Sequence, residues 1–378
     1  MQLMLALITG VIWLYLLWRF VRPLPGPRWL KAALALLLLL AAEYRLVVEL
    51  ICGGVPSQIL PREILIVLAW AFDTVLLLLM LSIVRDVIGM LAFVMRRAPG
   101  RRILADRRLT VGIGVLAVVL AGWGVWQAVK VPAVKTVNMS PPGLPQAFDG
   151  YRIVQLTDLH ATRLLPAWWI ADVVARSNAL HPDLIVVTGD LQDGMPAARM
   201  GDVRPLRNLH APDGVLMVPG NHEYYSDYRG WMKVFRHLGL HTLENAHVLI
   251  HHHGVTLAVA GLTDRAAERF GLPGPDLAAA LDGIPSGTPL MVLSHRPDTA
   301  RTIARSGAML ELSGHTHGGQ ILGPGLLTRW ANNGFVSGLY RVGAMRLYVS
   351  NGTGLWAGLA IRLGRPSEIT QIVLHAAP

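Results

Sequence analysis

The feature that most constrains the fold is a set of long apolar stretches confined to the first third of the chain. Overall, 53% of the 378 residues are hydrophobic. A helix needs about 20 mostly apolar residues to cross roughly 30 Å of hydrocarbon. Three stretches reach that length and the first falls slightly short. The sequence therefore predicts a transmembrane region at residues 1–130 with four helices, over residues 3–17, 29–51, 64–84 and 109–129.

A cleaved signal peptide is the alternative interpretation of the first stretch. Signal peptides begin with a basic segment and end at a cleavage site of small residues. Met1-Gln2 carries no basic residue, and no such cleavage site follows the apolar run. We therefore expect the first stretch to remain as a membrane helix.

Basic residues are distributed unevenly around the predicted spans. Loops rich in Lys and Arg stay in the cytoplasm, and the two loops that would share one side hold eleven such residues against three opposite. With four spans, everything after residue 130 then lies outside the cytoplasm, which in a bacterium is the periplasmic side of the plasma membrane. The eleven are Arg19, Arg22, Arg28, Lys31, Arg85, Arg96, Arg97, Arg101, Arg102, Arg107 and Arg108, and the three are Arg62, Lys130 and Lys135.

Ionisable residues also occur within the predicted spans. Glu43, Arg45 and Glu49 fall towards the outer end of the second span, and Asp73 lies well inside the third. Such residues are functional candidates by default. Since no second charged span suggests a transport path, we expect Arg45 to pair with Asp73 and hold two helices together.

The rest of the chain divides into a linker and a second domain. Pro141, Pro142, Gly143 and Pro145 predict a semi-extended segment, so we place the linker at residues 131–150 and the domain at 151–378. Residues 1–137 hold 15 Lys and Arg against 6 Asp and Glu, while residues 138–378 hold 19 against 18. The second domain therefore lacks the basic surface that nucleic-acid binding requires.

In residues 151–378, strand-like runs alternate with helical patterns, which predicts a layered α/β domain. His251-His252-His253-Gly254 lies between two short apolar runs, and we interpret it as a hairpin turn rather than a metal site. The expected strands are 151–156, 184–187, 215–218, 256–260, 290–293, 309–312, 345–349 and 369–374, and the expected helices are 167–180, 228–238 and 297–306.

Five short polar blocks follow one another in this domain. Four of them come directly after strand-like runs. Because open α/β sheets bind ligands at the carboxyl ends of their strands, we expect the blocks to converge on one site. They are Thr157-Asp158-Leu159-His160, Thr188-Gly189-Asp190, Gly220-Asn221-His222-Glu223, Ser294-His295 and Gly314-His315-Thr316-His317.

The blocks offer a mixed set of oxygen and nitrogen ligands without a thiolate, which suits borderline or hard divalent ions. Seven ligands exceed the needs of one tetrahedral centre. An aspartate shared by two ions roughly 3.5–4 Å apart would give each ion a workable set and an open position for water. The only cysteine, Cys52, lies in the apolar region, and no Gly-x-Ser-x-Gly motif occurs, so nothing indicates a covalent nucleophile.

The five blocks resemble the signature of the calcineurin-like metallophosphoesterases: Asp-x-His, Gly-Asp, Gly-Asn-His-Glu, His and Gly-His-x-His. The resemblance runs from near Tyr151 to the C-terminus. It implies a double β-sandwich flanked by helices in four layers, and an enzyme that hydrolyses phosphate esters with two divalent metal ions.

The resemblance also implies a role for each residue of the blocks. His222 would face the phosphate and protonate the leaving oxygen or stabilise the transition state, and Glu223 would orient His222. The first metal would be bound by Asp158, His160 and His317 and the second by Asn221, His295 and His315, with Asp190 as the bridge.

One branch of the family is disfavoured. Purple acid phosphatases place a tyrosine three residues after the Gly-Asp aspartate, where this chain has Asp193, so we expect no ferric-tyrosinate centre. Manganese, iron and zinc remain alternatives because availability as well as affinity decides which ion binds. We interpret Asp193 and Asp264, which lie near strand ends, as loop residues or as supports of the ligands.

The sequence thus predicts a membrane-anchored binuclear phosphoesterase that acts on a phosphate monoester or diester outside the cytoplasm. One alternative is a cytoplasm-facing pyrophosphohydrolase similar to the UDP-diacylglucosamine hydrolases, which membrane topology would distinguish. Another is a non-catalytic membrane scaffold, which the intact set of seven ligands disfavours.

Two apolar segments suggest a substrate class. Residues 164–169, with Trp168 and Trp169, and residues 354–361, with Trp356, are candidates for the rim of the site. Tryptophan favours the membrane–water interface, so we hypothesise a phosphorylated lipid or a lipid-linked phosphodiester of the cell envelope as substrate. The alternative is that the tryptophans pack into the core.

Overall fold

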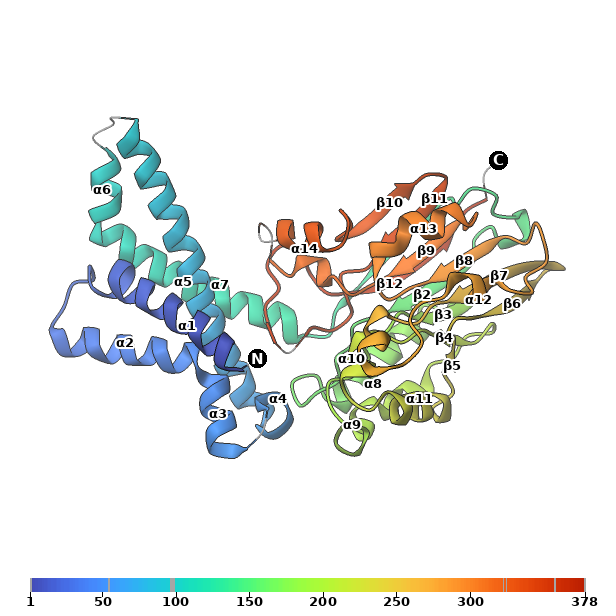
Figure 1. Ribbon diagram of the computed structural model, residues 1–378, viewed down its shortest axis with the longest axis horizontal. Coiled ribbons are helices and arrows are strands. Elements are labelled where there is room, and N and C mark those ends of the chain that lie inside the picture. The colour runs from blue at the N-terminus through green and yellow to red at the C-terminus, as the bar shows by residue number, and fades with distance from the viewer. Residues whose placement is uncertain are drawn as a thin grey trace. The chain divides into compact units, whose positions relative to one another are not determined.

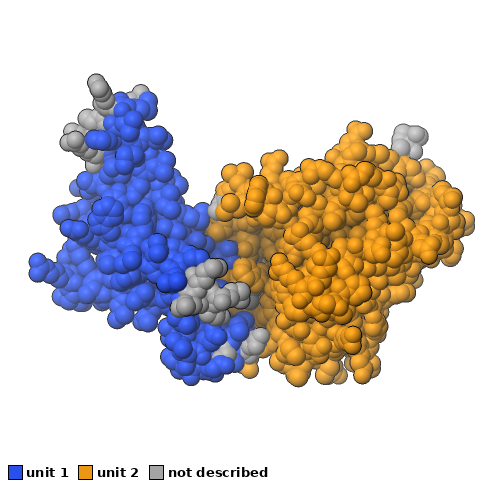
Figure 2. Space-filling model, viewed as in Figure 1, with its two compact units in different colours: residues 1–127, 359–361 blue, residues 128–358, 362–378 orange. Residues whose placement is uncertain are grey.

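The computed structural model describes residues 2–53, 55–95, 99–321, 323, 325–356 and 358–376. The chain divides into two compact units, residues 1–127 with 359–361 and residues 128–358 with 362–378 (Figure 2). The first unit is helical, and the second contains all the described strands (Figure 1).

The first unit contains two helices that stand out by length. Helix α5 (Arg62–Val94) has 33 residues and α7 (Arg107–Val129) has 23. Of the described helices, only these two are long and apolar enough to cross a bilayer, by length and composition alone. The others are α1 (Gln2–Leu16) with its π-helical continuation η1 (Leu17–Val21), α2 (Arg28–Ala42), α3 (Tyr44–Cys52), α4 (Pro56–Ile59) and α6 (Pro99–Ala105).

The prediction of four membrane spans is therefore not confirmed. The second expected span is interrupted, because Glu43 (φ −100°, ψ 10°) leaves helical geometry between α2 and α3. The third continues ten residues beyond its expected end, so Arg85 lies inside α5 rather than in a loop. Arg96 and Arg97 lie outside the described residues, as do the side chains of Arg101 and Arg102.

Polar contacts join the helices of this unit. Arg19 of η1 donates two hydrogen bonds to the carboxylate of Asp86 in α5, at 2.6 and 2.7 Å, and the Tyr15 hydroxyl donates a third at 2.8 Å. Among the described residues, no hydrogen bond joins Arg45 to Asp73, as the expected pair would require. Asp73 is buried and its carboxylate oxygens have no hydrogen-bond partner among the described residues, while the Arg45 guanidinium lies over the ring of Phe72 at 5.2 Å.

The second unit is built on two six-stranded mixed sheets, with strand orders β1-β12-β2-β3-β4-β5 and β10-β11-β9-β8-β7-β6. The first sheet comprises β1 (Ala133–Met139), β12 (Glu368–Leu374), β2 (Arg152–Leu156), β3 (Leu184–Val187), β4 (Val215–Met217) and β5 (His241–Thr242). The second comprises β10 (Gly338–Val342), β11 (Met345–Val349), β9 (Leu310–Ser313), β8 (Leu290–Leu293), β7 (Val255–Gly261) and β6 (Ala246–His252).

The two sheets pack face to face over one apolar core. Alternate residues of each strand point into it, among them Ile153 and Val186 from the first sheet and Val259 and Leu312 from the second, as the two-residue period of a strand requires. The outer face of the second sheet packs on Ala280 and Ile303 of two helices. These are α12 (Leu277–Leu281) and α13 (Ala300–Arg305).

Further helices lie along the first sheet (Figure 1). Trp169 and Trp231 are fully buried, one in each of the two longer ones. The helices are α8 (Ala167–Asn178), α9 (Pro196–Val203), α10 (Asn221–Tyr225) and α11 (Tyr228–His237), while α14 (Gly325–Ala331) follows the last polar block. This helix–sheet–sheet–helix layering agrees with the fold expected from the sequence.

The strands and helices expected after residue 151 all form, with ends shifted by at most a few residues. The hairpin at residues 251–254 also forms, since β6 pairs antiparallel with β7 and the turn residues His253 (φ 47°) and Gly254 (φ 79°) are left-handed. Such φ values are typical of tight hairpin turns. The histidine run is therefore part of a hairpin.

The prediction of a linker at residues 131–150 is wrong. Residues 133–139 form β1, which pairs in parallel with β12 at the other end of the chain. Leu144 and Phe148 belong to the core between the sheets. The proline and glycine residues mark only a turn within this segment, because a local signal does not reveal a pairing with residues more than 200 positions away.

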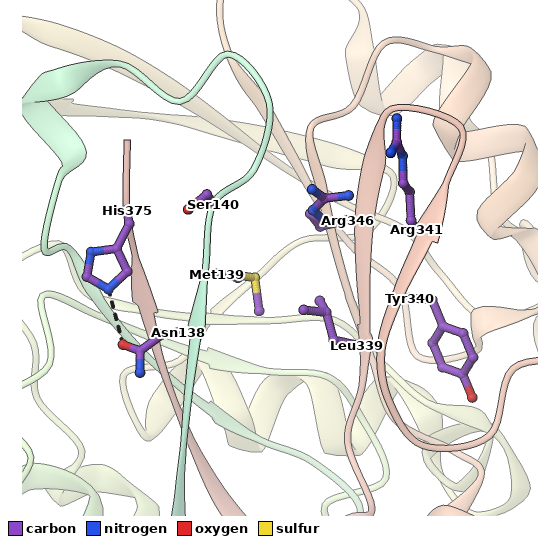
Figure 3. A pocket seen from close by; sticks show the side chains of 8 residues that line it. All are labelled: Asn138, Met139, Ser140, Leu339, Tyr340, Arg341, Arg346 and His375. Carbon is purple, nitrogen blue, oxygen red and sulfur yellow. Dashed lines mark hydrogen bonds between the residues drawn. The ribbon is translucent and has the colours of Figure 1, made fainter. Parts of the chain in front are cut away.

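The open edges of the two sheets border a cavity of about 520 Å³ (Figure 3). It lies between β1 and the β10–β11 hairpin, where Arg341 and Arg346 are opposite each other across the two strands. None of the residues of the five blocks lines it, so this cavity is distinct from the strand ends that carry them.

Candidate metal centre

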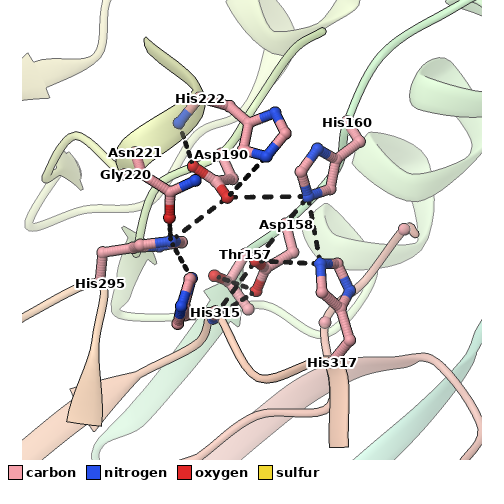
Figure 4. A network of polar contacts seen from close by, with 12 residues as sticks. Thr157, Asp158, His160, Asp190, Gly220, Asn221, His222, His295, His315 and His317 are labelled. Carbon is pink, nitrogen blue, oxygen red and sulfur yellow. Dashed lines mark hydrogen bonds and ion pairs between the residues drawn. The ribbon is translucent and has the colours of Figure 1, made fainter. Parts of the chain in front are cut away.

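The five polar blocks meet at one end of the two sheets (Figure 4). Strands β2, β3 and β4 are parallel neighbours in the first sheet, and β8 and β9 are parallel neighbours in the second. Four blocks directly follow β2, β3, β8 and β9, and the block that begins at Gly220 follows β4 after Val218 and Pro219. Parallel strands bring their carboxyl ends to the same edge, so the expected convergence of the blocks is confirmed.

The backbone turns sharply where the ligands sit. The left-handed region is uncommon for residues other than glycine and costs of order 1–3 kcal/mol per residue, so it persists only where the surroundings enforce it. Here it turns the side chains back across the strand ends. The residues concerned are Asp158 (φ 54°), His160 (φ 45°), Asp190 (φ 56°), His315 (φ 69°) and His317 (φ 49°).

Glycines in the blocks allow this close packing. A Cβ atom at Gly220 would overlap the carboxylate of Asp190, and one at Gly314 would overlap the side chains of Thr157 and Asp158. The Gly-Asn-His-Glu and Gly-His-x-His blocks therefore need glycine because another block fills the space that a side chain would take.

One group of donor atoms comes from the first and last blocks. One ligand atom from each of Asp158, His160 and His317 lies within 4.8 Å of the others. His160 Nε2 is 3.2 Å from His317 Nε2, which in turn is 3.6 Å from Asp158 Oδ1. All three residues are buried.

A second group comes from the four other ligand positions, Asp190, Asn221, His295 and His315. Ligand atoms of Asp190, His295 and His315 also lie within 4.8 Å of one another. His295 Nε2 is 3.2 Å from Asp190 Oδ2, 3.1 Å from His315 Nδ1 and 3.2 Å from Asn221 Oδ1. The structure thus brings the seven sequence-predicted ligands into two adjoining groups.

Asp190 lies between the groups. Its Oδ2 atom is 3.2 Å from His295 Nε2 in one group and 3.7 Å from His160 Nε2 in the other. Buried imidazole nitrogens and carboxylate oxygens that face one another need a shared proton or a cation between them. Two groups of borderline donors around one shared carboxylate fit two divalent ions.

The pKa values of the candidate ligand imidazoles differ. Burial lowers the pKa of His295, but the charge of Asp190 outweighs it and raises the pKa to about 10, whereas His315 and His317 shift the other way. Burial, followed by the charges of His295 and Arg296, lowers the pKa of His315 well below its usual value. Burial, followed by the charges of His160 and Arg362, does the same to His317. Neutral imidazole is the form that binds metal ions.

His222 stands beside the ligands without belonging to either group. Its backbone N–H donates to Asp190 Oδ1 at 2.8 Å, and its side-chain Nε2 is 4.0 Å from Asp190 Oδ2. The side chain is 19% exposed, more than the imidazoles of His160, His295 and His317. Burial lowers the pKa of His222, but Asp190 and Asp193 outweigh it and raise the pKa to about 9.

The expectation that Glu223 orients His222 needs correction. The Glu223 carboxylate accepts hydrogen bonds from the backbone amides of Gly220 (2.7 Å), Asp190 (3.1 Å) and Leu191 (2.8 Å). It therefore fastens two blocks to each other. The group that contacts the His222 imidazole is Asp193, whose Oδ1 lies 2.5 Å from His222 Nδ1.

Asp193 contacts both a ligand and His222. The same Oδ1 atom is 3.0 Å from Nδ1 of His160. A carboxylate in this position fixes the tautomer and ring orientation of an imidazole whose other nitrogen faces a metal or a substrate. Of the two interpretations of Asp193, the structure favours the support of ligands.

Sequence reasoning missed two arginines. Arg296, next to His295, donates to Asn221 Oδ1 at 2.8 Å and to Asp264 Oδ2 at 2.7 Å, which gives Asp264 a supporting role as well. Buried Arg362 donates to the carbonyl oxygens of His317 and Gly354, both at 2.6 Å. The position of Arg296 next to His295 in the chain could have indicated its role, whereas nothing in the sequence around Arg362 indicates one.

The two predicted apolar segments behave differently. Trp169 is fully buried and so packs into the core, whereas Trp168 and Trp356 are 55% and 45% exposed. The segment of Trp356 adjoins the site, because the Gly354 N–H donates to the Asp158 carbonyl oxygen at 3.0 Å. Ala357 of this segment lies outside the described residues.

The contacts of Asp193 yield a prediction. Asp193→Asn should lower turnover of bis-p-nitrophenyl phosphate roughly 10–100-fold, because a support of this kind typically contributes that much. Asp282→Asn, at the exposed end of α12, is the matched control and should leave turnover unchanged. Wild-type turnover in the Asp193 variant would mean that His222 is oriented by other groups.

Comparison with known proteins identifies the domain. A family model described as calcineurin-like phosphoesterase matches residues 151–319. A transmembrane protein with metallophosphoesterase domain from Danio rerio is 33% identical over 279 residues, which cover 71% of this chain and 63% of that protein. The chain thus spans less than two thirds of that relative's length.

Two bacterial relatives extend the comparison. A metallophosphoesterase of Helicobacter pylori strain J99 is 32% identical over 279 residues and 73% of each chain. The UDP-2,3-diacylglucosamine pyrophosphatase LpxG of Chlamydia trachomatis is 26% identical over 318 residues, which cover 68% of this chain and 93% of that protein. Together with the geometry of the five blocks, these matches show that the chain belongs to the calcineurin-like phosphoesterase family.

Proposed function

We propose that this chain is a membrane-anchored phosphoesterase that uses two divalent metal ions to hydrolyse a phosphate monoester or diester. The observation that carries the proposal is the carboxylate of Asp190, which lies between two groups of buried or half-buried donor residues. One ion would be held by Asp158, His160 and His317 and the other by Asn221, His295 and His315.

The residues around these two groups of ligands would have other roles in the reaction. When bound, two divalent ions supply positive charge to a phosphoryl group and make water a better nucleophile. His222, held through Nδ1 by Asp193, presents Nε2 beside the site and would donate a proton to the leaving oxygen. Arg296 and Arg362 hold the segments that carry Asn221 and His317 in place.

The donor chemistry limits the choice of ion. Carboxylate, amide and imidazole ligands suit manganese, iron and zinc, and all three remain candidates. Cys52 is exposed on α3 in the other unit and takes no part in the site. The scaffold alternative is disfavoured because all seven ligand positions are filled by competent side chains that converge.

We further propose that the protein is a multi-pass plasma-membrane protein with its site outside the cytoplasm. The apolar lengths of α5 and α7 and the transmembrane relative from Danio rerio support membrane anchoring. The orientation of the second unit is argued from α7 alone, because the basic residues Arg107 and Arg108 at the start of this helix favour a cytoplasmic start. Whether α1 and α2 also cross does not alter this argument.

A phosphorylated lipid or lipid-linked phosphodiester is the substrate class that we propose. Two observations support it: Trp356 is exposed and lies two residues after Gly354, which contacts Asp158, and the chain is similar to LpxG, which is named for a diacylglucosamine substrate. A cytoplasm-facing pyrophosphohydrolase similar to LpxG is the alternative. It differs in the side of the membrane on which the site lies.

The first prediction from this proposal concerns the metal ions. Asp190→Asn should lose most of one ion per chain and nearly all turnover, because it removes the shared ligand. His222→Ala should keep both ions and lose roughly 10²–10⁴-fold in turnover, the usual contribution of an acid–base group. Elemental analysis of the purified proteins and assays with bis-p-nitrophenyl phosphate measure both effects.

The control for these variants is Asp276→Asn, because asparagine also caps a helix and Asp276 caps α12 at the surface. It should retain both ions and full turnover. Two ions per chain in an active Asp190→Asn protein would refute the proposed ligand assignment.

The second prediction concerns topology. Alkaline phosphatase fused after Val131, between α7 and β1, should be active in a bacterial host, and green fluorescent protein fused there should stay dark. Both follow from the cytoplasmic start of α7. Fusions after Met95, at the end of α5, are the control and should give the opposite pattern. A fluorescent fusion after Val131 would favour the cytoplasm-facing alternative.

The third prediction concerns the substrate. For a lipid phosphodiester in mixed micelles, kcat/KM should exceed that for its water-soluble headgroup analogue, and Trp356→Ala should reduce the difference. Leu249→Ala removes an exposed apolar side chain from β6 and is the control. Equal efficiency on both substrates in wild type and variant would exclude a role for the apolar rim.

A further inference from the structure

Helix α14 (Gly325–Ala331) exposes an apolar surface immediately after the last metal block. Leu326, Leu327 and Trp330 are 74%, 75% and 86% exposed, and the helix has no buried residue. The longer helices α8 and α11 of the same unit each bury large apolar side chains, among them Trp169 and Trp231. Three such side chains within five residues form a patch that water solvates poorly.

The helix is fixed to the loop that carries the candidate ligand His317. A Cβ atom at Gly319 would lie 2.9 Å from Gly325 Cα, so the two backbone segments approach closely. The far end of the helix is closed by hydrogen bonds from Asn332 N to Thr328 O (3.1 Å) and from Gly334 N to Arg329 O (2.8 Å). The exposed side chains are therefore presented from a defined position near the metal centre.

The chain itself indicates what covers this surface. Helix α7 ends at Val129 and β1 begins at Ala133. The three residues between them reach about 10 Å when extended. The second unit therefore begins within that distance of the point where α7 would leave a bilayer. With α7 in a membrane, as proposed, a lipid surface lies close to the start of the second unit.

The composition of α14 fits a lipid surface better than a protein partner. Leucine and tryptophan beside an arginine are typical of helices that lie at the membrane–water interface. A stable protein interface buries about 800 Å² on each partner, more than three side chains of a seven-residue helix provide. A protein that is already anchored in the membrane can make a further contact with the lipid surface even if that contact is small, because the anchor keeps the two surfaces close together.

We propose that α14 is a membrane-docking helix whose Leu326, Leu327 and Trp330 enter the boundary between lipid headgroups and acyl chains, while Arg329 meets lipid phosphates. The inference rests on the proposed membrane anchoring. Because α14 follows His317 so closely in the chain, docking brings lipid headgroups close to the metal centre. This gives a lipid-linked substrate a short path to the ligands.

Site-directed spin labelling of the full chain tests this inference. The only cysteine is exposed, so Cys52→Ser provides the background, and a nitroxide is attached at Leu327→Cys or, independently, at Trp330→Cys. Met200→Cys, 54% exposed in α9, is the matched control. The proteins are reconstituted in vesicles of phosphatidylethanolamine and phosphatidylglycerol, and access of oxygen and of a water-soluble nickel chelate is measured.

In vesicles, the labels on α14 should be several-fold more accessible to oxygen relative to nickel than the label at position 200. The same relative accessibility at all three positions would place α14 in water and overturn the proposal. Shielding from both reagents would place α14 against protein and also overturn it. Extraction of the protein by alkaline carbonate would refute membrane anchoring itself, whereas retention with a water-exposed α14 would refute the docking alone.

Discussion

A buried carboxylate where two sheets meet is the constraint on which the site depends. Asp190 has lost its water, and a desolvated negative charge is tolerated only where donors and positive charge surround it. The His222 amide and the imidazoles of His160 and His295 supply that environment. Glu223 in turn ties the Asp190 amide to Gly220. Five strands must therefore end close to Asp190. The glycines and the left-handed residues of the blocks make this close packing possible.

The sequence predicted the parts of the fold that local patterns encode. Strands such as β3 and β8 were predicted to the residue, because a short apolar run bounded by polar residues is sufficient to mark a buried strand. The prolines before Gly150 led to the wrong prediction of a linker, because the strand in this segment is not marked by a local pattern. The strand β1 exists through its pairing with β12, more than 200 residues away, and no local pattern encodes that partner. The break at Glu43 was missed because an apolar run does not reveal where its helix ends.

The same distinction applies to the site. The seven candidate ligands lie within short blocks at strand ends, so the pattern of the sequence was enough to predict that they converge. Asp193 and Arg296 act through contacts between blocks, with His222 and with Asn221, respectively. Glu223 was assigned to its neighbour His222, yet its carboxylate accepts from the backbone amides of Asp190 and Leu191 in another segment. Proximity along the chain identified the candidate ligands and left the role of Asp193 open, but it did not predict the contacts of Arg296 and Arg362.

His317 lies between a tightly packed part of the candidate metal centre and a part whose side chains are exposed. On one side, Arg362 holds the His317 carbonyl, and a Cβ atom at Gly318 would overlap the Asn351 side chain, so this segment has little freedom to move. On the other side, α14 begins within a few residues and commits none of its side chains to the core. The packing that fixes the ligands therefore ends where the exposed apolar surface starts. Changes on α14 can alter what approaches the metal centre without disturbing the ligands, whereas changes at Arg362 cannot.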